Sequence, residues 1–156
     1  MINVLFVCLG NICRSPMAEA VFKHLVEQEG LVSHFNIDSV GTSSYHIGDL
    51  AHRGTRRVLS DHGIKCTSIA RQINRRDLET TDYIVAMDQS NVSDLQYASR
   101  GVLADDRISL LLSYADGVTR LDVPDPYYSG NFEEVYQLVE AGCRGLLAHI
   151  REEQGI

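Results

Sequence analysis

The chain opens with a segment that restricts the fold more than any other part of the sequence. Residues 2–7 are rich in apolar β-forming side chains, which is typical of a short strand buried on both faces of a parallel sheet. Residues 8–14 then read as a loop. Ser15 has the character of a helix N-cap and Pro16 that of a first helical residue, and the apolar spacing predicts a helix to about Glu29. This order of strand, loop and helix favours an α/β fold.

The rest of the chain continues the alternation of strands and helices. The segment 116–131 contains prolines and glycines and is predicted to be a loop. Right-handed crossovers would place helices on both faces of one parallel sheet, in a single domain over residues 1–156. Ligands of such sheets bind beyond the carboxyl ends of the strands, where Cys8, Gly41 and Asp88 would converge. Further strands are predicted at about 35–40, 83–87 and 107–112, and further helices at about 50–62, 88–97 and 132–150.

The composition excludes several classes of protein. With 156 residues, 44% of them hydrophobic, the chain is long enough for a core that needs neither disulfides nor a metal. No apolar run approaches the roughly 20 residues of a membrane span, and the first residues lack the basic start of an export signal, so we expect a cytoplasmic protein without a membrane partner. The net charge of −7 argues against a nucleic acid partner. The four cysteines form no C-x-x-C pair and no zinc pattern, so we expect reduced thiols and no metal site.

Cys8 and Arg14 form a C-x5-R motif between the first predicted strand and helix. That position turns backbone N–H groups and the positive end of the helix dipole toward a bound anion. Gly10 would let an anion approach the backbone, and Asn11 tolerates a positive φ. Arg14 would hold two phosphoryl oxygens, and the same positive field would make Cys8 a thiolate near neutral pH. The motif therefore predicts a nucleophile at the base of a phosphate site.

Two separated motifs carry a family resemblance. The segments 7–16, VCLGNICRSP, and 123–128, VPDPYY, resemble those of the low-molecular-weight protein tyrosine phosphatases. The resemblance implies a flavodoxin-like three-layer sandwich with a four-stranded parallel sheet. It also implies hydrolysis of protein phosphotyrosine without metal or cofactor, through a phosphocysteine intermediate and with inorganic phosphate as product. The likeness extends to residues 37–39, 70–72, 82–88 and 131–133.

The resemblance also implies a role for each residue that matches a family motif. Cys8 would be the nucleophile, Arg14 the phosphate clamp and Asp125 the general acid and base. Ser68 and Ile69 stand where vertebrate members tend to have a histidine and a lysine, which favours a bacterial-type member. The phosphate-binding loop would comprise Leu9, Gly10, Asn11, Ile12, Cys13, Arg14 and Ser15, the loop support Asn11, Ser15, Ser39 and Asp88, and the aromatic walls Tyr45 and Tyr127.

Three other functions could use a C-x5-R loop. A phosphocysteine carrier module would not need Asp125 between two prolines. An arsenate reductase needs further cysteines close together downstream of the loop, whereas only Cys66 and Cys143 follow it, far apart in the chain. Protein-arginine phosphatases resemble this chain but carry threonine where Ile12 stands, and the bulky side chain favours phosphotyrosine. None of the six histidines receives a role from the sequence.

Overall fold

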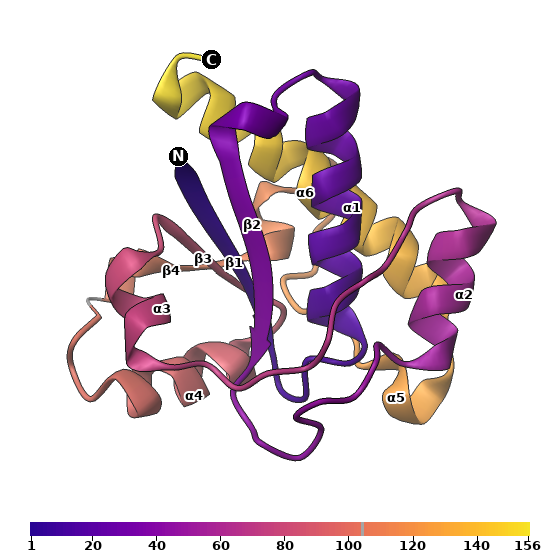
Figure 1. Ribbon diagram of the computed structural model, residues 1–156, viewed down its shortest axis with the longest axis horizontal. Coiled ribbons are helices and arrows are strands. Elements are labelled where there is room, and N and C mark those ends of the chain that lie inside the picture. Colours follow the sequence, from indigo (N-terminus) through magenta and orange to yellow (C-terminus); the bar gives the residue numbers. More distant parts are fainter. Residues whose placement is uncertain (104) are drawn as a thin grey trace.

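Four parallel strands form the centre of the molecule, whose computed structural model describes residues 1–103 and 105–156 (Figure 1). The strand order is β2-β1-β3-β4, so that β1 has a neighbour on each side. The register sets Cys8 opposite Gly41 and Val7 opposite Ala86. The carboxyl ends of β1, β2 and β3 therefore lie together, at the edge where Cys8, Gly41 and Asp88 were predicted to converge. The strands are β1 (Ile2–Cys8), β2 (Phe35–Gly41), β3 (Tyr83–Ala86) and β4 (Ile108–Leu110).

Helices cover both faces of this sheet (Figure 1). Helices α1 and α6 pack against each other on one face, over a core that includes Phe6, Phe22 and Leu146. Helices α3 and α4 lie on the other face, where Ile84 and Leu95 are fully buried. The expected flavodoxin-like α/β architecture is confirmed. The helices are α1 (Arg14–Gln28), α2 (Arg53–Asp61), α3 (Arg75–Thr80), α4 (Gln89–Ser99), α5 (Pro126–Ser129) and α6 (Phe132–Gln154), with 3-10 turns η1 (Val32–His34), η2 (Asp105–Arg107) and η3 (Leu111–Tyr114).

No helix within residues 1–103 and 105–156 is long and apolar enough to span a bilayer.

Helix α1 begins earlier than the sequence predicts. Cys13 is the N-cap residue and Arg14 the first helical residue, so Ser15 lies inside the first turn. The predicted capping role of Ser15 is wrong because its hydroxyl contacts the Sγ of Cys8. Pro16 remains compatible with this start, since backbone N–H groups of a first turn have no partner within the helix.

Helix α2 begins later than predicted. Leu50 lies outside the helix and pairs with Ile69 in an isolated antiparallel bridge. The helix starts at Arg53 because the ring of His52 accepts a hydrogen bond from the backbone N–H of Gly54 and so caps the first turn.

Three other predictions of local structure need correction. The predicted loop 116–131 contains the short helix α5, which the side chain of Asp125 caps. Helix α3 was not predicted, although Asn74 and Asp77 form a capping box at its start that could have revealed it. The strand predicted at 107–112 is confined to β4, because the chain turns into η3 directly after it.

Candidate active site

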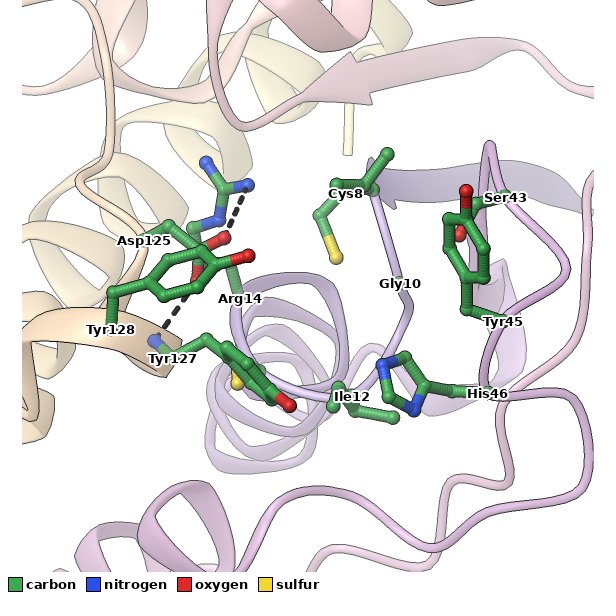
Figure 2. Close-up of a pocket in the computed structure, with 12 residues that line it drawn as sticks. Cys8, Gly10, Ile12, Arg14, Ser43, Tyr45, His46, Asp125, Tyr127 and Tyr128 are labelled. Atoms are coloured by element: carbon green, nitrogen blue, oxygen red, sulfur yellow. Dashed lines mark hydrogen bonds and ion pairs between the residues drawn. The ribbon is translucent and has the colours of Figure 1, made fainter.

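A cavity of about 180 Å³ opens at the carboxyl edge of the sheet (Figure 2). Three segments form its walls: the loop between β1 and α1, the loop that follows β2, and the segment that leads into α5. These segments are distant in sequence and meet because the parallel strands end at the same edge. The lining residues are Cys8, Leu9, Gly10, Ile12, Cys13, Arg14, Ser43, Tyr45, His46, Asp125, Tyr127 and Tyr128.

Cys8 is the last residue of β1, and its sulfur points toward the middle of the cavity (Figure 2). The Sγ lies 3.3 Å from the backbone nitrogen of Asn11, which donates to it, and 3.0 Å from the Oγ of Ser15. The residue is 3% exposed. The loop therefore brings a backbone N–H and a hydroxyl group to the sulfur.

Asn11 holds the loop in a conformation that few residues adopt. Its φ is 56°, in the left-handed region, where asparagine is one of the few tolerated residues besides glycine. The side-chain Nδ2 donates to the Oγ of Ser15 at 2.8 Å and to the Oγ of Ser39 at 3.0 Å. The backbone N–H of Arg71 donates to the Oδ1 of Asn11 at 3.1 Å. These contacts tie the loop to the neighbouring strand β2.

The neighbouring strand also approaches the loop closely at Gly41. A Cβ on Gly41 would lie 2.8 Å from the carbonyl oxygen of Leu9, and the backbone N–H of Ser43 donates to that same oxygen. Only glycine fits at this position without a backbone shift. The loop after β2 is thereby fixed against the loop between β1 and α1.

Arg14 is a buried cation beside the sulfur. Its Nη1 lies 2.5 Å from the Oδ2 of Asp88 and donates to the carbonyl oxygen of Val123, and its Nη2 lies 3.6 Å from the Oδ2 of Asp125. Burial alone would lower the pKa of the guanidinium. The charge of Cys8 and the contacts with Asp88 raise this pKa by more than burial lowers it, so it lies above its ordinary value. Arg14 is therefore a permanent positive charge held in one orientation.

Asp125 is placed at the mouth of the cavity by the two prolines that flank it and by its own side chain. The Oδ1 accepts a hydrogen bond from the backbone N–H of Tyr127 at 3.0 Å, which makes Asp125 the N-cap of α5. The other carboxylate oxygen faces Arg14. The side chain is 32% exposed, so water reaches the carboxylate.

Aromatic side chains surround the entrance (Figure 2). Tyr127 is 48% exposed and Tyr45 is 84% exposed, and both line the cavity as expected, together with Tyr128. The ring of His52 contacts Tyr127 edge-on and stacks on Phe132. This packing fixes the position of Tyr127 at the start of α5.

Sequence reasoning missed three residues of the cavity, Ser43, His46 and Tyr128. His46 lies over Gly10, so that a Cβ at Gly10 would be 2.9 Å from the His46 ring. The Oγ of Ser43 is buried and has no hydrogen-bond partner within residues 1–103 and 105–156. The polar composition of the loop after β2 was visible in the sequence, but nothing there showed which of its side chains turn inward.

The other cysteines differ from Cys8 in their surroundings. Burial, together with the negative charges of Asp125 and Cys8, raises the pKa of Cys13 to about 12. Burial raises the pKa of Cys143, which is fully enclosed in the core beneath α6, and that of Cys66. These three thiols are therefore protonated at neutral pH.

Comparison with known proteins agrees with this geometry. Residues 3–155 match the sequence profile described as low molecular weight phosphotyrosine protein phosphatase. The chain belongs to that family. It is 48% identical over 155 residues to the low molecular weight protein-tyrosine-phosphatase YfkJ of Bacillus subtilis, with 99% of each chain covered.

Solved structures of this phosphatase family share the fold. The crystal structure of YfkJ from Bacillus subtilis superimposes with a TM-score of 0.93 at 49% identity, and covers 98% of this chain and 96% of that one. The crystal structure of the Drosophila arginine phosphatase DARP has a TM-score of 0.87 at 35% identity, with 95% and 97% covered. A structural neighbour of this chain is thus described as an arginine phosphatase.

Proposed function

We propose that this phosphatase hydrolyses phosphotyrosine in proteins through a phosphocysteine intermediate on Cys8. The observation that carries the proposal is the position of the Cys8 sulfur, 3.0 Å from the Ser15 hydroxyl at the base of a cavity that also holds Arg14 and Asp125. The loop from Leu9 to Ser15 would surround the phosphoryl oxygens. A guanidinium held by Asp88 and Val123 would neutralise the dianion.

In the first step the thiolate of Cys8 attacks phosphorus. The S–P bond forms while the P–O bond to the tyrosine breaks, and a protonated Asp125 gives its proton to the leaving phenolate oxygen. A phenol has a pKa near 10, so this proton transfer accelerates the step roughly 10²–10⁴-fold. The tyrosine side chain of the product then leaves between the walls of the cavity.

In the second step water attacks the phosphocysteine. The Asp125 carboxylate accepts a proton from that water, the P–S bond breaks, and inorganic phosphate and the Cys8 thiolate are released. Every atom needed for both steps comes from the substrate, water and the side chains of Cys8, Arg14 and Asp125. We therefore propose catalysis without a metal or other cofactor.

Depth and aromatic walls support phosphotyrosine as the substrate. The rings of Tyr45 and Tyr127 stand above a sulfur that is almost fully enclosed. A long planar side chain reaches that sulfur, whereas phosphoserine is too short, and ring packing adds about 0.5–1.5 kcal/mol. We propose phosphotyrosine-containing proteins as partners, with no role for nucleic acid or membrane.

We place the activity in the cytoplasm because the mechanism needs a reduced thiol. Cys8, Cys13, Cys66 and Cys143 are all free, and reducing compartments keep such thiols available.

A protein-arginine phosphatase is the second candidate, since the structural neighbour DARP is described as an arginine phosphatase. Ile12 lines the cavity beside the phosphate-binding loop and is 8% exposed. Its apolar bulk provides no hydrogen bond for a guanidinium, so phosphotyrosine remains the better fit.

The test is steady-state hydrolysis of phosphotyrosine, phosphoserine and phosphoarginine peptides in the presence of EDTA. We expect the highest kcat/KM for phosphotyrosine, no loss with EDTA, and no turnover by Cys8→Ser with an unchanged circular dichroism spectrum. A preference for phosphoarginine or phosphoserine, or turnover by Cys8→Ser, contradicts the proposal.

A further inference from the structure

The imidazole of His52 lies between the first turn of helix α2 and the aromatic wall of the cavity. Helices α2 and α5 lie side by side at this point, and the ring of His52 contacts that of Tyr127 (Figure 1). His52 is half-buried and does not line the cavity itself. Any effect of His52 on the substrate must therefore pass through a neighbour that does line the cavity.

Main-chain atoms hold His52 on two sides. The backbone N–H of His52 donates to the carbonyl oxygen of Ile12, at 2.6 Å, in the loop between β1 and α1. The Nδ1 of its ring accepts a hydrogen bond from the backbone N–H of Gly54, at 3.0 Å. The ring therefore has little freedom to turn, because the main chain of the residue and one ring nitrogen are each bonded to other main-chain atoms.

One face of the imidazole is supported by the ring of Phe132. The two ring centroids are 5.0 Å apart and the planes are within 21° of parallel. Phe132 itself lies directly on the backbone of Gly54, where a Cβ would be 2.4 Å from the Cε2 of Phe132. Phe132 also packs against the buried cluster that contains Ile12. The support beneath His52 is therefore part of the packed interior next to the site.

Three aromatic rings within the described residues contact the ring of Tyr127. The centroid of the His52 ring lies 5.9 Å from that of Tyr127, with the planes at 73°, an edge-to-face arrangement. Tyr128 is the next residue of the same short helix and is 87% exposed, and His46 belongs to the loop after β2. Of these three rings, that of His52 is the one that stacks on Phe132, so it connects Tyr127 to the packed interior.

We propose that His52 is a positioning residue for the substrate: its ring holds Tyr127 at the cavity, where the Tyr127 ring packs on the aromatic ring of the substrate. Because the free enzyme already holds Tyr127 in place, less conformational freedom is lost when the substrate binds. The proposal rests on the proposed function only in taking an aryl phosphate as the substrate. His52 itself does not touch that substrate.

The side chain of His52 has two roles that different replacements can separate. Its Nδ1 caps helix α2 and so stabilises the fold, whereas its ring as a whole contacts Tyr127. Asparagine supplies an oxygen that caps a helix but has no ring, and phenylalanine supplies a ring but no acceptor. His52→Asn should therefore affect substrate binding and leave stability nearly intact, and His52→Phe should do the reverse.

The test is steady-state hydrolysis of a phosphotyrosine peptide, together with competitive inhibition by inorganic phosphate, which has no ring to contact Tyr127. For His52→Asn we expect a KM about fivefold higher, a kcat within about twofold of the wild type, and an unchanged inhibition constant for phosphate. For His52→Phe we expect a KM within about twofold of the wild type. Urea unfolding of His52→Phe should give an unfolding equilibrium constant about fivefold larger, because α2 loses its cap.

Two further variants show whether the effect passes through Tyr127. His62→Asn is the matched control: His62 lies at the other end of α2 and its ring stacks on Tyr136, 3.8 Å away, and neither residue lines the cavity. Its KM should equal that of the wild type. Adding His52→Asn to Tyr127→Ala should raise KM no further than Tyr127→Ala alone, because His52 acts only through that ring.

An unchanged KM in His52→Asn would overturn the proposal. So would an equal rise of KM in His52→Phe or His62→Asn, a matching rise in the inhibition constant of phosphate, or a further rise in the double variant. If His52→Asn does not fold, His52→Ser takes its place, because serine is also a good N-cap without a ring. If the wild type does not hydrolyse phosphotyrosine, the proposed function fails, and the same series with para-nitrophenyl phosphate still decides the role of His52.

Discussion

The side chain of Arg14 connects three parts of the site. Its guanidinium contacts Asp88 at the start of α4, the carbonyl oxygen of Val123, and Asp125 at the start of α5. Helix α1 after β1, helix α4 after β3 and the segment after β4 that leads into α5 are therefore joined through one planar group. A lysine carries the same charge but cannot make these contacts together.

For Arg14→Lys we predict a loss of kcat/KM of roughly a hundredfold or more, because the ammonium cannot hold two phosphoryl oxygens and Asp88 at once. The measurement is hydrolysis of para-nitrophenyl phosphate, with thermal melting as the control for folding. Near-normal activity would remove Arg14 from the mechanism.

For Asp125→Asn we predict a loss that depends on the leaving group. An activated phenol such as para-nitrophenol leaves without much help, whereas phenol needs a proton from Asp125. The ratio of kcat/KM for para-nitrophenyl phosphate to that for phenyl phosphate should therefore rise in the variant. An unchanged ratio would show that Asp125 positions α5 and does not donate a proton.

For Ile12→Thr we predict a shift in preference toward phosphoarginine. The change replaces apolar bulk in the cavity lining with a hydroxyl that can contact a guanidinium. Relative kcat/KM for matched phosphotyrosine and phosphoarginine peptides measures the shift. Equal ratios in the variant and the wild type would show that Ile12 does not determine specificity.

At the scale of secondary-structure elements, the close packing of α6 against η3 depends on a glycine. A Cβ at Gly145 would lie 1.8 Å from the carbonyl oxygen of Tyr114, which is backbone and cannot turn aside. Gly145 therefore lets the long C-terminal helix lie directly on the segment that follows β4. Helix propensity alone would favour alanine there by about 1 kcal/mol.

We predict that Gly145→Ala lowers the free energy of unfolding by about 1–3 kcal/mol, opposite in sign to the effect of helix propensity, because the two backbones must separate. Urea unfolding measures the change. Glu152→Ala, at an exposed position of the same helix, should be nearly neutral. A stabilised Gly145→Ala would mean that η3 does not lie against α6 as described.

At the scale of the whole molecule, the sequence predicts the layers and the centre of the site but not the contacts between distant segments. The strand before Cys8 and the C-x5-R motif are local patterns, so both were predictable. The place of His46 in the cavity was not, because it depends on a partner brought near only by the fold, Gly10 beneath the ring. Helix α5 was missed because its four residues are held by a cap and a proline and have no apolar periodicity.

The measurement that tests the account most directly is capture of the phosphorylated enzyme during the first turnover. Asp125→Asn is mixed with para-nitrophenyl phosphate, whose activated leaving group makes the first step nearly independent of Asp125 while hydrolysis of the phosphocysteine stays slow. The reaction is quenched with denaturant, and the protein is analysed by intact mass and peptide mapping. The account predicts one phosphoryl group per chain, on the peptide that contains Cys8, and none when Cys8→Ser is treated in the same way. A phosphoryl group on any other residue, or release of para-nitrophenol with no phosphorylated Cys8 at any time, would contradict it.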